Sequence, residues 1–271
     1  MITERSMNII VTAGGTSEPI DNVRRIANTG TGRLGSLVAD ELAEADWTDH
    51  IFYVCAKDSI RPVSKRVTCV EIQSVADLQE AVTELTKKYV IHGVVHSMAV
   101  SDYKVRSVST IDSLSEYLEK RSAETGDLQK KIVQGMDETD LREGVGKLSS
   151  QMGAPLLLLE PTPKILPMFR EMAPQAVIIG FKLLSQVSVE ELFDTAHRLL
   201  VKNRCDFVLA NDMTEIDENH HRGYLIDPKE TYRPLTRSRR SQRELFKQYT
   251  VRWNTDEEKY NIRCYRKYCS L

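Results

Sequence analysis

The sequence predicts an α/β protein in which a mainly parallel sheet lies between two layers of helices. Short apolar runs rich in β-branched residues recur along the chain, and segments with a helical spacing of apolar residues lie between many of them. Such alternation is typical of a sheet that helices cover on both faces. The predicted strands are residues 8–12, 50–55, 67–72, 93–96, 156–159, 176–181 and 207–210.

Three segments place their apolar residues on one helix face. The helices predicted from this spacing are residues 34–42, 75–85 and 189–200. Ser188 precedes the third helix and is a favourable N-cap residue. Parallel sheets bind ligands at the carboxyl ends of their strands, so residues that directly follow strands are the first candidates for a site.

The composition limits the possible partners and locations. The 271 residues carry a net charge of −2, which gives no reason to expect binding to nucleic acid or to an anionic membrane. No apolar run approaches the ~20 residues of a membrane span, and the first residues lack a signal-peptide core. Five scattered cysteines without a Cys-x-x-Cys pair favour a reducing cytoplasm, and no metal site is predicted among the histidines.

A single domain is expected over residues 1–253, with two segments that break the alternation. Residues 122–154 are polar, charged and dotted with glycine, and we interpret them as a mobile lid segment. Residues 222–253 are predicted to form two strands around an Asp-Pro-Lys turn and then a basic helix, together a small β-hairpin arm. Residues 254–271 show no clear period and stay unassigned.

The most informative segment is 9–35, where a strand turns at Gly14-Gly15 and a second glycine cluster opens a helix. Small residues let backbone N–H groups approach a phosphate, and a helix N-terminus adds partial positive charge. The run GTGRLG at 30–35 matches the dinucleotide fingerprint G-x-G-x-x-G, but a polar insert separates it from the strand. An NAD(P)-dependent oxidoreductase, with Asp58 after the second strand, is therefore an alternative function.

Three further candidates lie at predicted strand ends, and each also has a purely structural interpretation. Asp102 could bind a sugar hydroxyl, a base amine or Mg²⁺, or it could cap a turn. Asn211 offers an amide donor and acceptor, or it could form an Asx turn. Phe181 could stack on a base, although an aromatic residue in this position is more often part of the core.

Three basic residues complete the candidates. Lys147 lies in the GKLSS run of the predicted lid, where a lysine is normally just solvated. Arg198 and Lys202 are four residues apart on one helix face, and their mutual repulsion hints at a shared anion.

Taken together, several motifs resemble the phosphopantothenoylcysteine synthetase family. The matching runs are TAGGTSEPIDNVRRIANTGTGRLG, VSDY, GKLSS, TPKIL, IIGFK and LAND, spread over residues 7–253. The resemblance implies a Rossmann-like three-layer fold, a homodimer in which the hairpin arm at 222–253 is the dimerisation surface, and a ligase that forms a C–N bond. In that reaction 4′-phosphopantothenate reacts with CTP, which Mg²⁺ accompanies, to give an acyl-cytidylate. L-cysteine then attacks the acyl-cytidylate and releases CMP.

The resemblance also implies roles for individual residues. Asn28 corresponds to the family's intermediate-handling asparagine, and Lys147 corresponds to its mobile-loop lysine. Arg24 is expected near a substrate phosphate, and Asn211 is assigned to substrate binding. The nucleotide site maps to Gly14, Gly15, Met98, Ala99, Asp102, Phe181, Arg198 and Lys202.

Two positions depart from the family pattern. Gly30 stands where relatives commonly have a hydroxyl residue, and Arg33 stands where they commonly have a lysine. Arginine keeps the positive charge but prefers a forked, bidentate geometry.

Overall fold

The main element of the fold is an eight-stranded sheet with the strand order β12-β11-β10-β9-β6-β1-β4-β5. The computed structural model describes residues 6–142, 146–215, 220–228, 232–238, 252–254 and 261–263. The strands from β10 to β5 are parallel, whereas β11 and β12 are antiparallel at one edge. The bounds are β1 Met7–Ala13, β4 Thr48–Ala56, β5 Val67–Ile72, β6 Gly93–His96, β9 Val177–Leu184, β10 Phe207–Asp212, β11 His220–Ile226 and β12 Tyr232–Ser238.

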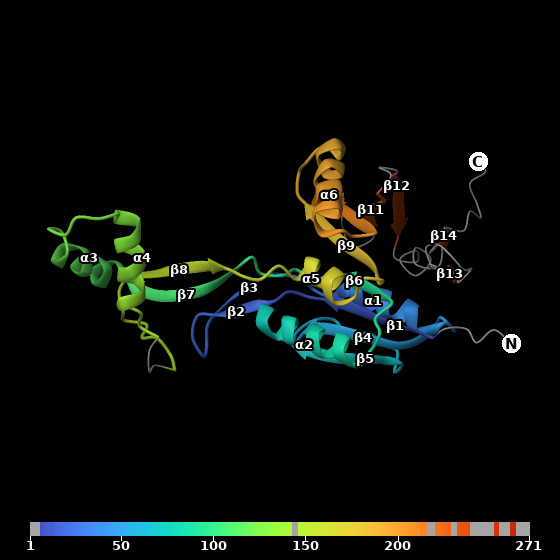
Figure 1. The fold of residues 1–271 in the computed structure, drawn as a ribbon, viewed down its shortest axis with the longest axis horizontal. Helices are drawn as coiled ribbons and strands as arrows, with labels where there is room; N and C mark the ends of the chain where they lie inside the picture. The colour runs from blue at the N-terminus through green and yellow to red at the C-terminus, as the bar shows by residue number, and fades with distance from the viewer. Residues whose placement is uncertain are drawn as a thin grey trace.

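Helices cover both faces of this sheet, which confirms the predicted three-layer fold (Figure 1). One face packs against α1 around Tyr53 and Val38, and the other packs against α2, α5 and α6 around Phe169 and Ile178. Within the described ranges, no helix has the length and apolar character needed to cross a membrane. The bounds are α1 Arg33–Ala43, α2 Val75–Lys88, α5 Ile165–Met172 and α6 Val189–Asn203.

Local sequence explains where these helices begin. Asp77 N–H donates to the Ser74 hydroxyl at 3.2 Å and Ser74 N–H donates to the Asp77 carboxylate at 2.8 Å, which makes a capping box for α2. Ser188 caps α6 as predicted, by accepting from Glu191 N–H at 3.1 Å. α1 follows Gly32, which has a left-handed φ of 76° and provides no side-chain cap. Arg33 N–H contacts the Thr31 hydroxyl at 3.4 Å, and the N–H groups that follow it in the first turn can meet other partners.

A smaller unit projects from the carboxyl end of β6 (Figure 1). In it β7 pairs antiparallel with β8, and α3 and α4 pack at the far end. The predicted strand at 156–159 is confirmed, but it belongs to this projection and not to the main sheet. β7 escaped prediction because polar residues and a register shift between Val105 and Ser107 interrupt its apolar pattern. The bounds are β7 Tyr103–Thr110, α3 Ile111–Lys120, α4 Leu128–Glu138 and β8 Pro155–Pro161.

The predicted lid at 122–154 is not one continuous loop. It contains α4, whose N-cap is Asp127; the Asp127 carboxylate accepts from Gln129 N–H at 2.9 Å. Leu148, near the end of the segment, is 3% exposed and packs with Val105 and Val108. The polar composition of this segment concealed an amphipathic helix, and the lid role stays a prediction.

The predicted hairpin around the Asp-Pro-Lys turn is confirmed, but it does not stand apart as an arm. β11 pairs with β10 and extends the main sheet, and β12 pairs with β11. A free sheet edge favours this arrangement because its unpaired backbone groups accept another strand. The predicted basic helix lies outside the described residues, and of the tail only one short strand pair is described, β13 Arg252–Asn254 with β14 Asn261–Arg263. The boundary at residue 253 stays a prediction.

Phe169 gives a direct test of the core between the sheet and α5. Its ring is fully buried and lies 5.3 Å from the His96 ring. We expect Phe169→Ala to lower the free energy of unfolding by about 3–5 kcal/mol, because it removes apolar contacts and leaves a cavity. Chemical denaturation measures this loss. Val63→Ala is the control, since Val63 is 87% exposed, and a similar loss in both variants would contradict the assignment.

Candidate functional site

The two glycine clusters of the sequence meet at the carboxyl end of β1. Ala99 N–H donates to the Gly14 carbonyl at 2.8 Å, and Thr16 N–H donates back to the Ala99 carbonyl at 3.0 Å. A Cβ on Gly15 would overlap the carbonyl oxygen of Asn28, and a Cβ on Gly30 would overlap that of Gly14. The backbones therefore touch where only glycine fits. This contact explains Gly30, because the fold leaves no room for a side chain at this position.

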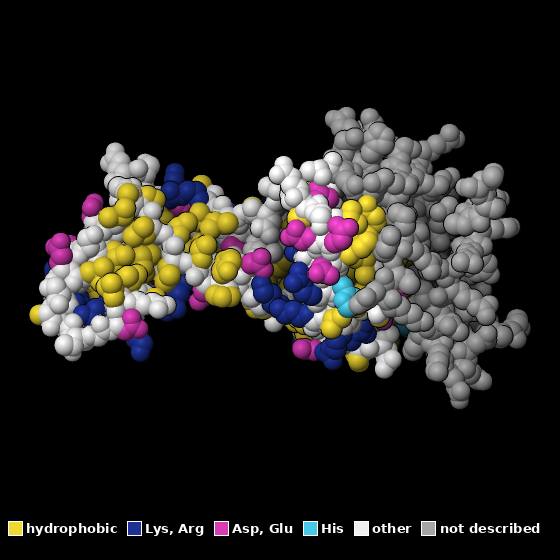
Figure 2. Space-filling view, turned by 90° about the horizontal axis from the view of Figure 1, so that it is seen from above, with side chains coloured by type: hydrophobic (Ala, Val, Ile, Leu, Met, Phe, Trp, Pro, Cys, Tyr) yellow, Lys and Arg dark blue, Asp and Glu magenta, His cyan; other side chains and the backbone are white. Residues whose placement is uncertain are grey.

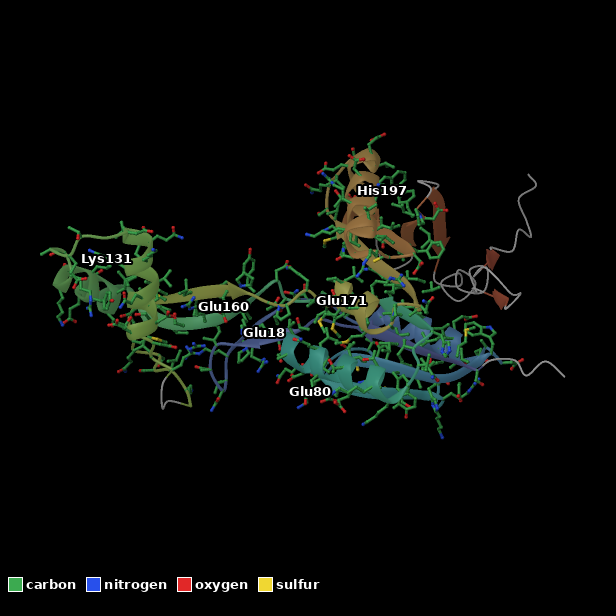
Figure 3. The ribbon with its side chains drawn as sticks, viewed as in Figure 1. Glu18, Glu80, Lys131, Glu160, Glu171 and His197 are labelled. Atoms are coloured by element: carbon green, nitrogen blue, oxygen red, sulfur yellow. The ribbon has the colours of Figure 1, made fainter. Side chains whose placement is uncertain are left out.

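The polar insert between these clusters forms a short hairpin of β2 (Ser17–Pro19) and β3 (Arg25–Ala27). Buried Glu18 fastens the hairpin to the main body, since its carboxylate accepts from Val75 N–H at 2.8 Å, at the start of α2. Figure 3 shows Glu18 where the hairpin approaches α2. The sequence offered no signal for this contact, because the partners are 57 residues apart.

Ser59 is a site residue that sequence reasoning missed. It follows β4, and its hydroxyl fills the space that a Cβ on Gly14 would occupy. A Cβ on Gly32 would lie 2.9 Å from the Cβ of Ser59, so this side chain sits between the two glycine turns. The hydroxyl is buried and finds no hydrogen-bond partner among the described residues. It lies beside the uncapped N-terminus of α1, where a helix attracts anions.

The loop that carries Ser59 also supports the second glycine turn. Ile60 N–H donates to the Thr31 carbonyl at 3.0 Å. The Tyr53 hydroxyl donates to the Ile60 carbonyl at 2.7 Å and also contacts the Gly32 carbonyl at 3.1 Å. Burial raises the pKa of Tyr53 far above its usual value, so this hydroxyl keeps its proton and remains a donor.

The guanidinium of Arg24 is hydrogen-bonded to other residues of the protein. Its guanidinium donates to the Asp21 carboxylate at 2.6 and 3.0 Å and to the Leu148 carbonyl at 2.9 Å. The two bonds from the Arg24 guanidinium hold the pKa of Asp21 well below its ordinary value, because they stabilise the charged carboxylate. The expected role of Arg24 near a substrate phosphate stays a prediction.

Both expected catalytic residues lie at this hairpin. Asn28 ends it, and its N–H donates to the Thr16 carbonyl at 3.1 Å. Lys147 is exposed, but its two neighbours are bound to the hairpin turn. Asn22 N–H donates to the Gly146 carbonyl at 3.0 Å, and Leu148 N–H donates to Asp21 at 3.1 Å. The structure thus brings together residues that lie 119 positions apart in the sequence.

The predicted nucleotide residues after β6 lie beside the glycine turn. Ala99 forms a parallel bridge with Gly15, and the side chain of Met98 is buried. Asp102 does not directly follow β6 as expected but stands at the root of the projection, just before β7. Its carboxylate is exposed and pairs with Lys164 at 2.5 Å. A ligand would have to compete with that lysine for Asp102.

Phe181 and Asn211 lie on neighbouring strands of the main sheet. Phe181 is half-buried in β9 and packs with the α1-side core, close to the level of β1's end. Asn211 is buried in β10, and a Cβ on Gly223 would lie 2.6 Å from its amide nitrogen. The neighbouring Asp212 accepts N–H donors from the loop before α6, Val187 among them, and from the short helix η1 (Met213–Glu215). The Thr214 hydroxyl, which donates to Asp212 at 2.7 Å, and these N–H donors lower the pKa of Asp212 to about 2.

The structure does not bring Arg198 and Lys202 to the glycine turn. Both are exposed on the second half of α6, which runs back toward the amino ends of the parallel strands. Arg198 contacts the Thr195 hydroxyl at 3.3 Å. Figure 3 labels the adjacent His197 on α6, far from Glu18 of the hairpin. The four-residue spacing places two cations on one face, but it does not show which edge of the sheet that face approaches.

Comparison with known proteins assigns the fold to a family. Residues 5–134 match the family described as the DNA/pantothenate metabolism flavoprotein C-terminal domain. The crystal structure of the DNA/pantothenate metabolism flavoprotein from Streptococcus pneumoniae superposes with a TM-score of 0.72 at 30% identity, over 89% of this chain and 97% of that chain. The chain belongs to this family, with its Rossmann-like α/β fold.

More distant relatives are named for coenzyme A biosynthesis. The bifunctional protein CoaBC of Thermococcus kodakarensis is 28% identical over 221 residues, which are 80% of this chain and 44% of that protein. The chain therefore spans about half the length of the curated relatives it matches. A structure of Cab2 in complex with phosphopantothenate-cysteine shares the fold, with a TM-score of 0.58 at 17% identity over 86% of this chain and 81% of that one.

The backbone contact at Gly30 can be tested by stability. We expect Gly30→Ala to lower the free energy of unfolding by about 1–3 kcal/mol, because the new Cβ overlaps the Gly14 carbonyl and forces the turns apart. Thr29→Ala, at the exposed neighbouring position, should change it by less than about 0.5 kcal/mol. Equal stability of the two variants in denaturant titrations would show that the turns are not in contact.

Proposed function

We propose that this protein is a phosphopantothenate–cysteine ligase that uses CTP. One observation carries the proposal: a single hairpin holds Asn28 beside the glycine turn and binds the Lys147 segment at its tip. Family membership and the names of the relatives support it. The partners proposed with it are 4′-phosphopantothenate, CTP and L-cysteine.

The proposed reaction has two steps. A carboxylate oxygen of 4′-phosphopantothenate attacks the α-phosphorus of CTP, and the P–O bond to pyrophosphate breaks to leave an acyl-cytidylate. The amine of L-cysteine then attacks the acyl carbonyl carbon. A C–N bond forms, the amine loses a proton and CMP leaves.

The residues suit the first step by electrostatics. Negative charge develops on phosphate oxygens, and fixed donors that already point at that charge stabilise the transition state. The uncapped N-terminus of α1 and the unpartnered Ser59 hydroxyl supply such donors. Lys147 adds a positive charge, and the Asn28 amide holds the intermediate without acting as a nucleophile. The segment around Lys147 would also shield the mixed anhydride from water.

Mg²⁺ is proposed to enter as the CTP complex. Among the described residues, no group of three His, Cys, Asp or Glu side chains could hold a metal ion. This fits Mg²⁺, which prefers substrate phosphates and retained waters to a cage of protein ligands. Its chemistry here would be to neutralise triphosphate charge.

A cytoplasmic location is likewise proposed. The described cysteines, Cys55, Cys69 and Cys205, are all unpaired thiols. Unpaired cysteines are typical of proteins in a reducing compartment.

A homodimer is proposed through β8. In the part of the chain that the structure describes, β8 pairs with β7 alone, and its exposed residues include Leu157 and Leu159. Hydrophobic side chains gather on this projection (Figure 2). An apolar edge strand offers unpaired backbone groups to another strand, and a two-fold axis allows two copies of β8 to satisfy each other. The surface proposed here is β8, and a dimerisation role of the arm at 222–253 stays a prediction.

The oxidoreductase alternative gains no support. The matching family model and the relatives reported above are named for pantothenate metabolism and coenzyme A biosynthesis, and none of these names describes an oxidoreductase. In the structure the whole β2–β3 hairpin lies between β1 and the run at 30–35, whereas a dinucleotide fingerprint joins strand to helix directly.

The ligase proposal predicts pyrophosphate release that requires both CTP and 4′-phosphopantothenate. Asn28→Asp should lower kcat by about 10²-fold or more, because a carboxylate repels the phosphate that the amide would hold. A coupled pyrophosphate assay measures this, and Gln129→Glu, an exposed amide-to-carboxylate change on α4, is the control. Absence of pyrophosphate from the wild-type protein with both substrates would refute the proposal.

The dimer proposal predicts that Leu159→Lys yields monomers, because a buried charge destabilises a strand–strand contact. Sedimentation velocity over a range of protein concentrations measures the mass. Val63→Lys, at an exposed position of the main body, should remain dimeric. A monomeric wild-type protein, or a dimeric Leu159→Lys variant, would exclude β8 as the interface.

A further inference from the structure

We propose that Asp21, through its ion pair with Arg24, is the positioning residue that holds Lys147 at the hairpin. The inference deepens the proposed function and rests on it. Its basis is a cluster of hydrogen bonds that fixes the backbone on both sides of Lys147 and leaves its side chain free to meet a ligand.

The Asp21 carboxylate is the centre of this cluster. Its side chain is 1% exposed, although it lies on a hairpin turn. One oxygen accepts the N–H groups of Val23 at 2.9 Å and of Arg24 at 2.7 Å. The other accepts the Arg24 guanidinium at 2.6 and 3.0 Å and the N–H of Leu148 at 3.1 Å. A buried carboxylate needs such partners, so the turn and the Leu148 segment depend on each other.

Arg24 completes the attachment. The same guanidinium that pairs with Asp21 donates to the Leu148 carbonyl at 2.9 Å. Both backbone polar groups of Leu148 are therefore bound by one ion pair. The Leu148 side chain is buried with Val105 and Val108 of β7 and with Ile20 and Ile26 of the hairpin.

The residue before Lys147 is held as well. The Gly146 carbonyl accepts from Asn22 N–H at 3.0 Å, one residue from Asp21 on the same turn. Lys147 thus lies between two anchored residues while its own side chain is exposed. No contact in this attachment involves the lysine side chain, so the position of residue 147 does not depend on which side chain it carries.

The attachment couples Lys147 to the glycine turn. The β2–β3 hairpin ends at Asn28, whose carbonyl packs against Gly15, and Glu18 fastens the hairpin to α2. Because its two neighbours are bound to the tip of this hairpin, Lys147 is held in a fixed position relative to the glycine turn at the base of the hairpin. An error of about 1 Å in placing a catalytic group can reduce the rate by about 10²-fold.

The decisive experiment is a double-mutant cycle on kcat for pyrophosphate release. Asp21→Asn keeps the shape of the side chain but turns an amide N–H₂ toward Arg24 or Leu148 N–H. If Asp21 acts through Lys147, Lys147→Arg will lower kcat about tenfold in the wild-type background and by less than about twofold in Asp21→Asn. Equal effects in the two backgrounds would overturn the proposal, because a merely structural role adds independently.

A second measurement does not depend on activity. Hydrogen exchange of the Leu148 amide should become more than about tenfold faster in Asp21→Asn, since its acceptor is weakened. Asp206→Asn is the matched control, because Asp206 also binds an arginine, Arg170 at 2.6 Å, and a backbone N–H, that of Ile178 at 2.8 Å. Asp206→Asn should leave the Leu148 exchange rate unchanged. In the Asp206→Asn background, Lys147→Arg should still lower kcat about tenfold.

These outcomes separate the two proposals. A wild-type protein without CTP-dependent turnover would refute the ligase function, and unchanged Leu148 exchange in Asp21→Asn would refute the attachment. A wild-type protein that turns over, with faster Leu148 exchange but additive effects of Asp21→Asn and Lys147→Arg, would refute the positioning role alone.

Discussion

The candidate site depends on a direct contact between two backbone segments, at positions where glycine has no side chain to separate them. At the end of β1, the chain around Gly14 and Gly15 touches the chain around Asn28 and Gly30, and a Cβ on Gly15 or Gly30 would overlap a carbonyl oxygen of the facing segment. This contact closes the base of the β2–β3 hairpin. Because the hairpin is closed there, the N-terminus of α1 lies beside β1 even though a polar insert separates them in the sequence.

Two buried carboxylates then attach the hairpin to the rest of the molecule. Glu18 binds the start of α2, and Asp21 binds Arg24 and Leu148. Each carboxylate accepts backbone N–H groups of a distant segment, and leaving either acceptor or donor unpaired in a buried position would cost about 1–3 kcal/mol or more. These polar residues of the insert therefore stabilise the structure, whereas composition alone would suggest that they bind a substrate.

Features that depend on a local apolar pattern were predicted correctly, whereas features that depend on contacts between distant segments were missed. The strands predicted for the main sheet and the three amphipathic helices are confirmed within a few residues, because burial imposes a local apolar pattern on them. β7 was missed where polar residues and a bulge break that pattern, and α4 was missed inside a polar segment. Asn28 and Lys147 were identified by resemblance, whereas Ser59 and Asp21 carried no motif and became candidates only through their contacts.

The amino-acid order alone was sufficient for the fold class, the family and the glycine turn, since each depends on residues that are neighbours in the chain. Only the tertiary structure shows that Gly30 has no space for a side chain and that Arg24 pairs with Asp21. The tertiary structure also shows that α6 directs Arg198 and Lys202 away from the glycine turn. These features arise from contacts between segments far apart in the sequence, and no local pattern of charge or hydropathy records which segments will meet.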